Sequence, residues 1–253
     1  MRIAVAGGTG IVGHHLTDLA RSAGLEPVVI GRSTGIDLLT GAGLPAALDG
    51  VDAVIDVVNT PTLSAKASRR FFGTTTATLL NAEADAGVRH HLALSIVNAA
   101  TVSAGYYAGK ALQEERVMRG AVPWTLLRAT QFHEFAAQTL DRGSRGAVAL
   151  VPVMRTQPVA AREVAARLLR LVLGSPRGIV PALAGPSEQT LGDMVRDYAR
   201  ATRSRALVVQ VRLPGRMGRA MRDGGLLPSP GTERGAQSFQ EWLETDVRAA
   251  PSV

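Results

Sequence analysis

Short apolar segments alternate with longer amphipathic segments through the first half of the chain, and this pattern predicts alternating strands and helices. Strands are expected at 2–6, 27–31, 52–58, 91–95 and 123–127. Helices are expected at 11–23, 62–86, 105–119 and 131–141, with a short strand near 35–38 and a small helix at 43–49. The strands read as continuous apolar runs, which is typical of a parallel sheet that is covered on both faces.

The pattern loosens from about residue 142. A β-rich stretch at 147–159, an amphipathic helix at 162–173, a strand at 179–183, a helix at 191–201 capped by Thr190 and a last helix at 237–247 are expected. Residues 214–235 are rich in Gly, Pro and Arg, which predicts a loop or a mobile segment. We therefore expect a core at 1–141 and a C-terminal, substrate-binding part at 142–253 that continues the same fold unit.

A glycine-rich turn, Gly7-Gly8-Thr9-Gly10-Ile11-Val12-Gly13, joins the first strand to the first helix. Gly7 permits a tight turn, Gly10 lets the backbone approach a pyrophosphate, and Gly13 lets the helix pack on the strand. The pyrophosphate would face free N–H groups at the positive end of the helix dipole. The turn predicts a dinucleotide site with contacts at Gly7, Gly10, Ile11, Val12 and Gly13; a tight turn without a ligand is the alternative.

The segments that follow the second and third strands bear on the choice of cofactor. An acidic residue after the second strand would bind the 2′-hydroxyl of NAD, but Arg32 and Ser33 stand there and suit a 2′-phosphate. This favours NADP over NAD, with a solvated arginine as the alternative. Asp37-Leu38 is expected against the adenine, and Val58-Asn59 is expected beneath the dinucleotide.

Tyr106 and Lys110 lie four residues apart at the start of a predicted helix, so they project from one face. A phenol titrates near pH 10, and a nearby ammonium lowers that pKa toward the range where a phenol acts as an acid or base. Lys110 can also bind a ribose hydroxyl. An exposed helical pair is the alternative, and Tyr107, which points elsewhere, is assigned to pocket lining or packing.

Ser95 closes the predicted strand at 91–95 and lies on the edge of the sheet where ligands bind. Its hydroxyl can polarise a substrate carbonyl, or it can serve in a turn. Ser95 and Tyr106 are eleven residues apart, and Ser103 competes for the same role.

Composition narrows the class of protein. The 253 residues contain no cysteine, which excludes disulfides and thiolate metal sites, and the histidines lack the carboxylates of a metal site, so no metal is expected.

The net charge of +7 is dispersed along the chain, and aromatic residues are few, so neither nucleic acid nor membrane is expected as a partner. We expect a cytoplasmic monomer or homodimer. Only Lys66 and Lys110 are lysines in a chain that otherwise uses arginine.

The motifs resemble those of the short-chain dehydrogenase/reductase superfamily, in its atypical, extended-like branch close to NmrA-like NAD(P)-binding proteins. The resemblance is carried by Gly7–Gly13, Phe72–Leu80, Ala86–His90, Leu94-Ser95, Tyr106–Lys110 and Val122–Phe132. It implies an α/β fold, a Rossmann-type doubly wound parallel sheet with helices on both faces and a small C-terminal substrate-binding cap. It also implies a nicotinamide cofactor, Tyr106 as acid or base, Lys110 as its helper and ribose ligand, and Ser95 as the group that orients a carbonyl.

The expected activity is therefore an NADP-dependent oxidoreductase that reduces or oxidises a small organic carbonyl or alcohol. Two alternatives remain open from the sequence. One is a non-catalytic, NmrA-like NADP(H) sensor that binds a protein partner, and the other is a lyase or epimerase that retains its cofactor.

Overall fold

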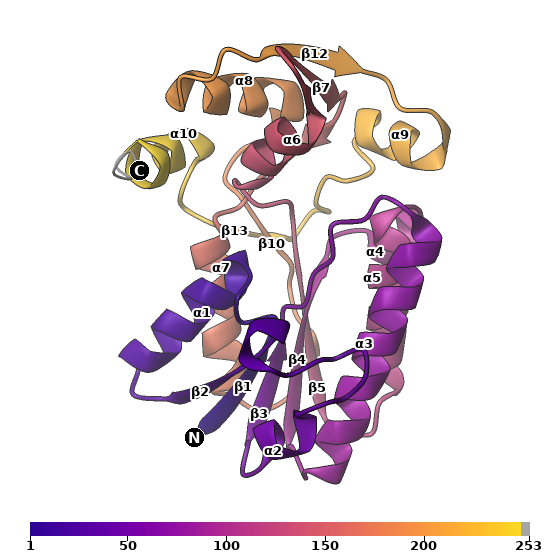
Figure 1. Ribbon diagram of the computed structural model, residues 1–253, viewed down its shortest axis with the longest axis vertical. Coiled ribbons are helices and arrows are strands. Elements are labelled where there is room, and N and C mark those ends of the chain that lie inside the picture. The colour runs from indigo at the N-terminus through magenta and orange to yellow at the C-terminus, as the bar shows by residue number, and fades with distance from the viewer. Residues whose placement is uncertain (249–253) are drawn as a thin grey trace. The chain divides into compact units, whose positions relative to one another are not determined.

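The structure, a computed structural model, describes residues 1–248 and divides into two compact units (Figure 1). The first unit contains residues 1–128 and 162–181, and the second contains 129–161 and the chain from 182 onward. This division differs from the expected boundary at residue 141. The chain leaves the first unit after its fifth strand and returns to it for the amphipathic helix α7 (Ala161–Val172), which buries Val164, Ala165 and Leu168.

The first unit is built on a twisted sheet with the strand order β5-β4-β3-β1-β2. These strands are β1 (Arg2–Ala6), β2 (Glu26–Ile30), β3 (Ala53–Asp56), β4 (His90–Ile96) and β5 (Trp124–Ala129). β1 pairs in parallel with β2 and β3, β3 pairs in parallel with β4, and the short β9 (Gly178–Ile179) pairs in parallel with β5. The predicted α/β class with a doubly wound parallel sheet is confirmed.

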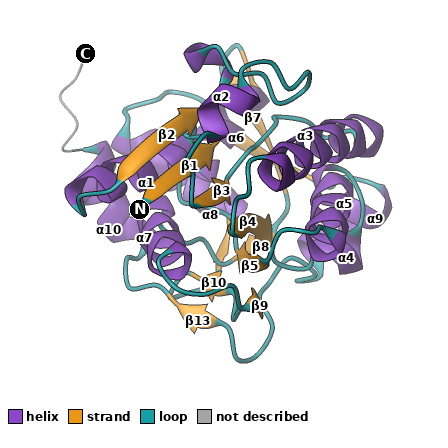
Figure 2. Ribbon diagram, turned by 90° about the horizontal axis from the view of Figure 1, so that it is seen from below, coloured by secondary structure: helices purple, strands orange, loops and turns teal. Residues whose placement is uncertain are grey.

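Helices cover both faces of this sheet (Figures 1 and 2). α1 (Ile11–Ser22) and α7 lie on one face, and α3 (Ala65–Asp85) and α5 (Tyr106–Arg119) lie on the other. The short helices α2 (Leu44–Leu48) and α4 (Ala99–Val102) complete the unit. Because strands are covered on both sides, Ile3, Ile55, Leu92 and Leu126 are fully buried.

The strand order creates a switch point. From β1 the chain moves outward to β2 and then returns to place β3 on the other side of β1. In such sheets the connections after the two central strands diverge and leave a crevice at their carboxyl ends, where ligands bind. By this rule a ligand is expected at the carboxyl ends of β1 and β3, beside the turn after Ala6 and the segment after Asp56.

The second unit has smaller sheets. β6 (Ser144–Arg145), β7 (Val148–Pro152) and β12 (Leu207–Val211) form one, β8 (Arg155–Thr156) and β11 (Gln189–Thr190) form another, and β10 (Leu183–Ala184) pairs with β13 (Glu233–Arg234). Its helices are α6 (Phe135–Gly143), α8 (Leu191–Ala201), α9 (Gly215–Arg222) and α10 (Phe239–Trp242), followed by a π-helical turn at Leu243–Val247. Thr190 caps α8 as predicted, because its side chain accepts a hydrogen bond from the N–H of Asp193.

Three expectations about local structure are wrong. No strand forms at 35–38: a 3-10 turn occupies Arg32–Thr34, and Asp37 makes one isolated bridge to Ala42 in a segment bent by glycines with positive φ. The predicted strand at 179–183 is split into β9 and β10. The predicted loop at 214–235 contains α9 and β13, because Gly218 lets the helix pack tightly against the backbone of Leu213.

Among the described residues, no helix has the length and apolar character needed to cross a membrane.

Candidate functional site

The glycine turn is held tightly against its surroundings. The Gly7 N–H donates to the carbonyl of Ile30 at 2.9 Å, and Gly7 has a φ of +81°, which favours glycine. A Cβ on Gly7 would lie 2.9 Å from the carbonyl oxygen of Val57. A Cβ on Gly13 would overlap the carbonyl oxygen of Gly7 and lie 2.5 Å from Cα of Gly8. These two glycines therefore allow β1, α1 and the segment after β3 to meet.

The N-terminus of α1 has the chemistry of an anion site. Gly10 is its N-cap residue, and no side chain in the described structure caps the helix or places an acidic group in its first turn. A Cβ on Gly10 would meet only the Gly7 carbonyl oxygen, at 3.3 Å. Ile11 is exposed at this end, whereas Val12 is buried against the core. A phosphate fits here because the helix dipole and the backbone N–H groups are not satisfied by the protein's own side chains.

The segment after β2 leaves Arg32 and Ser33 exposed. The hydroxyl of Thr34, not a residue of this pair, supports the turn by donating to the carbonyls of Val29 and Gly31. Asp37 accepts a hydrogen bond from the N–H of Leu39, and Leu38 is buried in a core cluster with Leu44 and other apolar residues. The side chain of Asp37 therefore shapes its own turn, and the expected contact of Asp37-Leu38 with adenine stays a prediction.

The close packing of α3 against α5 positions Tyr106 and Lys110. Ser68 of α3 donates a hydrogen bond of 2.7 Å to the carbonyl oxygen of Tyr106. A Cβ on Gly109 would overlap the Ser68 hydroxyl and lie 2.5 Å from the Ser68 carbonyl oxygen. Only a residue without a side chain lets the two helices approach this closely, so the register of α5 is fixed.

Tyr106 points toward the segment after β3. Its hydroxyl donates to Oδ1 of Asn59 at 2.9 Å, which connects two residues that the sequence assigned to the catalytic and cofactor sites. Burial, and secondarily the negative charge of Asp56, raises the pKa of Tyr106 above its usual range, although the ring keeps partial exposure. The expectation that Lys110 lowers the pKa of Tyr106 is therefore wrong for this structure, and the phenol remains protonated at neutral pH.

Lys110 is buried and lies deeper in the unit. Its Nζ donates to the carbonyl oxygen of Leu94 at 2.7 Å and lies 4.7 Å from the centre of the Phe72 ring. Burial lowers the pKa of Lys110 to about 8, while the carboxylates of Asp56 and Glu114 act in the opposite direction. An ordinary exposed helical pair, the alternative considered from the sequence, does not describe this residue.

Ser95 lies near the carboxyl end of β4, directly after the Leu94 carbonyl that Lys110 contacts. The residue is 4% exposed, and its hydroxyl has no hydrogen-bond partner among the described residues. A buried hydroxyl without a hydrogen-bond partner costs free energy, and a bound ligand that accepts or donates a hydrogen bond would remove that cost. Asn98 and Ser103 in the following segment have φ values of +60° and +43°, and such strained backbone is common near functional sites.

The sequence analysis missed Asp56, the last residue of β3. It is 2% exposed, accepts a hydrogen bond from the N–H of Val58 at 3.0 Å, and accepts another from Nε2 of Gln113 at 2.7 Å. A carboxylate inside an otherwise apolar strand was the signal available in the sequence. The pair of Arg128 and Glu114, joined by two hydrogen bonds of 2.9 and 2.7 Å, was also missed.

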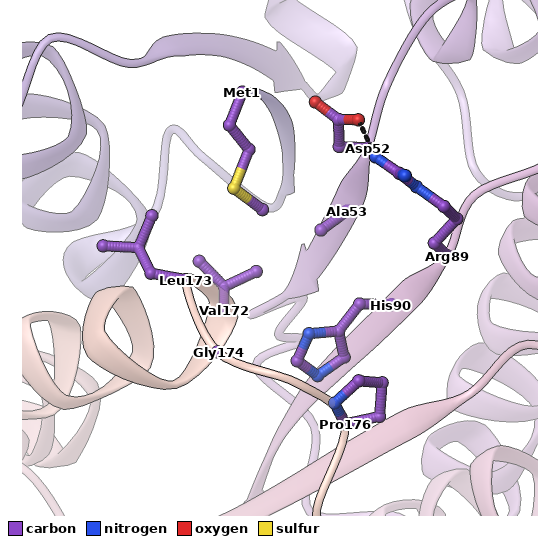
Figure 3. Close-up of a pocket in the computed structure, with 9 residues that line it drawn as sticks. All are labelled: Met1, Asp52, Ala53, Arg89, His90, Val172, Leu173, Gly174 and Pro176. Carbon is purple, nitrogen blue, oxygen red and sulfur yellow. Dashed lines mark hydrogen bonds and ion pairs between the residues drawn. The ribbon is translucent and has the colours of Figure 1, made fainter.

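A separate cavity of about 440 Å³ lies at the opposite end of the sheet, beside the first residues of β3 and β4 (Figure 3). Its lining includes His90, Asp52 and Arg89, and Asp52 and Arg89 are paired with each other. Because it lies at the amino ends of the strands, it is not the crevice in which this fold binds ligands.

No protein-family model matches the chain. A (4-alkanoyl-5-oxo-2,5-dihydrofuran-3-yl)methyl phosphate reductase from Streptomyces griseus is 29% identical over 218 residues, which cover 78% of this chain and 73% of that protein.

Among solved structures, MoeE5 in complex with UDP-glucose and NAD is similar, with a TM-score of 0.70, 17% identity and coverage of 96% of this chain and 92% of that one. A short-chain dehydrogenase/reductase superfamily protein from Agrobacterium tumefaciens with bound NAD has a TM-score of 0.66, 18% identity and coverage of 96% and 95%. TunA, an NAD-dependent NDP-hexosamine 5,6-dehydratase, has a TM-score of 0.70, 15% identity and coverage of 96% of both chains. These likenesses show the fold: the chain has the Rossmann-type α/β fold of the solved structures.

Proposed function

We propose that this protein is an NADP-dependent oxidoreductase that interconverts a small organic carbonyl compound and its alcohol. The observation that carries the proposal is the combination, within one unit, of an uncapped helix N-terminus after a glycine turn and a phenol, an ammonium and an unpartnered serine hydroxyl. The related reductase of Streptomyces griseus supports an enzyme that uses this fold for reduction.

Each residue has a distinct role in the proposed reaction. The backbone of the turn and the start of α1 hold the pyrophosphate. A nicotinamide cofactor held by these residues would supply or accept the hydride. The Ser95 hydroxyl donates a hydrogen bond to the carbonyl oxygen, and in the reducing direction Tyr106 gives that oxygen its proton. Lys110 donates a hydrogen bond from its ammonium group to a ribose hydroxyl.

The preference for NADP rests on Arg32 and Ser33, which are exposed after β2 where an acidic residue would select NAD. The similar solved structures named above hold NAD or are described as NAD-dependent, so this preference is a specific property proposed for this chain. Within the described structure no hydrogen bond or ion pair engages the Arg32 guanidinium or the Ser33 hydroxyl, and this pair suits a 2′-phosphate.

The decisive variant is Tyr106→Phe, which removes the proton donor and keeps the ring. The variant is assayed with NADPH on a set of small carbonyl compounds, and we expect its turnover to fall by about 100-fold or more. Its affinity for NADPH, measured by fluorescence titration, should stay close to that of the wild type. Unchanged turnover in Tyr106→Phe would refute the assigned role. Tyr107→Phe, which changes the adjacent buried tyrosine, is the matched control and should retain activity.

The same assay separates this function from a lyase or epimerase. Those reactions regenerate their cofactor, so product would form without net consumption of NADPH. An NADP(H) sensor would bind the cofactor and show no turnover on any substrate of the panel.

A further inference from the structure

The interior of the first unit contains a cation and an anion that make no direct ion pair. Lys110 is 4% exposed and Asp56 is 2% exposed. In the part of the chain that the structure describes, Lys110 has no carboxylate within ion-pair distance, and its bonding partner is a neutral carbonyl. Burying an isolated charge is costly, so a buried ammonium requires a compensating negative charge in its surroundings.

Asp56 is connected to the helix that carries Lys110. Gln113 lies three residues after Lys110, so both residues project from the same side of α5. The amide of Gln113, itself fully buried, donates to Oδ2 of Asp56. The carboxylate therefore lies against the part of α5 that presents the ammonium.

Asp56 also holds the segment on which the cofactor turn rests. Its Oδ1 accepts from the N–H of Val58, and the next residue, Asn59, accepts from the hydroxyl of Tyr106. A Cβ on Gly7 would come within 3.0 Å of Cα of Val58, so this segment and the glycine turn are in close contact. One carboxylate thus connects the cofactor turn with the catalytic helix.

We propose, on the basis of the function proposed above, that Asp56 is a positioning residue whose negative charge keeps the Lys110 ammonium protonated at neutral pH and whose hydrogen bonds fix the segment 57–59 between the glycine turn and α5. Burial, and after it the charge of Asp56, raises the pKa of Tyr106 and keeps the phenol protonated at neutral pH. Tyr106 therefore carries, at neutral pH, the proton that reduction of a carbonyl requires.

Other charged groups surround this arrangement. The Glu114 carboxylate on α5 also opposes the lowering of the Lys110 pKa. Glu114, however, is already paired with the guanidinium of Arg128 on β5 through two hydrogen bonds. Glu83 of α3 and His91 of β4 form their own buried pair, and the charge of Asp56 acts on both. Unlike Glu114 and Glu83, Asp56 makes no direct ion pair within the described structure, so its charge is the one left to act on Lys110.

The protonation of Lys110 can be measured directly, because the chain has only two lysines. In protein labelled with ¹³C-lysine, the Cε resonances of Lys110 and of the exposed Lys66 are followed against pH by NMR, and Lys66→Arg assigns them. We expect the wild-type Lys110 resonance to titrate near pH 8, the pKa to which burial lowers this amine. Asp56→Asn, which keeps the shape and removes the charge, should lower that midpoint by about 1 pH unit or more.

Gln113→Met is the matched control, since it removes the hydrogen bond and keeps the charge, and its midpoint should stay close to that of the wild type. An unchanged midpoint in Asp56→Asn, or an equal shift in both variants, would overturn the proposal. If Asp56→Asn does not fold, the wild-type titration decides: a midpoint near 8 agrees with the proposal, and one below 7 contradicts it. The titration needs no substrate, so a failure of this proposal is distinguishable from a failure of the proposed function, which unchanged turnover in Tyr106→Phe would show.

Discussion

Replacing each of two glycines in the glycine turn by alanine should impair different properties: Gly13→Ala should lose stability, and Gly10→Ala should lose affinity for the cofactor. A methyl group on Gly13 would overlap the Gly7 carbonyl oxygen and lie 2.5 Å from Cα of Gly8, both of them backbone atoms that cannot rotate away. Overpacking of this kind costs up to about 3 kcal/mol, and the better helix propensity of alanine returns about 1 kcal/mol. The expected net loss is about 2 kcal/mol, or a decrease in Tm of roughly 4–8 °C for a chain of this size.

Gly10→Ala is the contrasting variant. The nearest protein atom to the new methyl group is the Gly7 carbonyl oxygen, at 3.3 Å, so the turn must shift by only a few tenths of an ångström. Replacing glycine at an N-cap should cost only about 0.5–1 kcal/mol of stability. The methyl group would instead stand where a pyrophosphate approaches the helix, and NADPH affinity should fall at least about tenfold, which corresponds to about 1.4 kcal/mol.

Thermal unfolding of the two purified variants, together with fluorescence titration by NADPH, measures both effects. We expect Gly13→Ala to be the less stable protein and Gly10→Ala to be the stable one that binds poorly. A Gly13→Ala protein as stable as the wild type would refute the packing argument. Wild-type affinity for NADPH in Gly10→Ala would show that no phosphate occupies this turn.

The other predictions concern cofactor choice and the buried charges. Arg32→Ala should weaken NADPH binding about tenfold or more and leave NADH binding nearly unchanged, since only the 2′-phosphate is affected; equal losses for both cofactors would contradict the assignment. Glu83→Gln should lower the free energy of unfolding by about 3 kcal/mol, because it removes the negative charge that stabilises the buried His91 and leaves a neutral amide beside it. Urea titrations of this variant beside the wild type measure the loss, and a difference within error would show that the pair contributes nothing.

The same pair predicts how stability depends on pH. Burial opposes protonation of His91, but the Glu83 carboxylate outweighs it and raises the pKa of His91; burial also raises the pKa of Glu83. A pKa raised by folding gives stability that is present below the unfolded value and is lost as pH rises through the folded value. The wild type should therefore be less stable in urea at pH 9 than at pH 6, and Glu83→Gln should reduce that difference.

Local patterns in the sequence were sufficient for the first half of the fold. Each of the five main strands was predicted to within a few residues, because a strand buried on both faces must be apolar throughout. The position of α1 followed from the glycine turn, and the position of α8 followed from its cap at Thr190. Where the pattern was weak the prediction failed, as at α9, whose formation depends on the contact of Gly218 with the backbone of Leu213.

The sequence by itself determined the fold class, the glycine turn and the four-residue spacing of Tyr106 and Lys110, since each depends on neighbours along the chain. Only the tertiary structure decided the electrostatics of the site. It joined Asn59 to Tyr106 and placed Asp56 beside α5, and it turned the Lys110 ammonium toward the Leu94 carbonyl. A pKa depends on burial and on charges that are distant in sequence, and these are known only when strands and helices have been brought together.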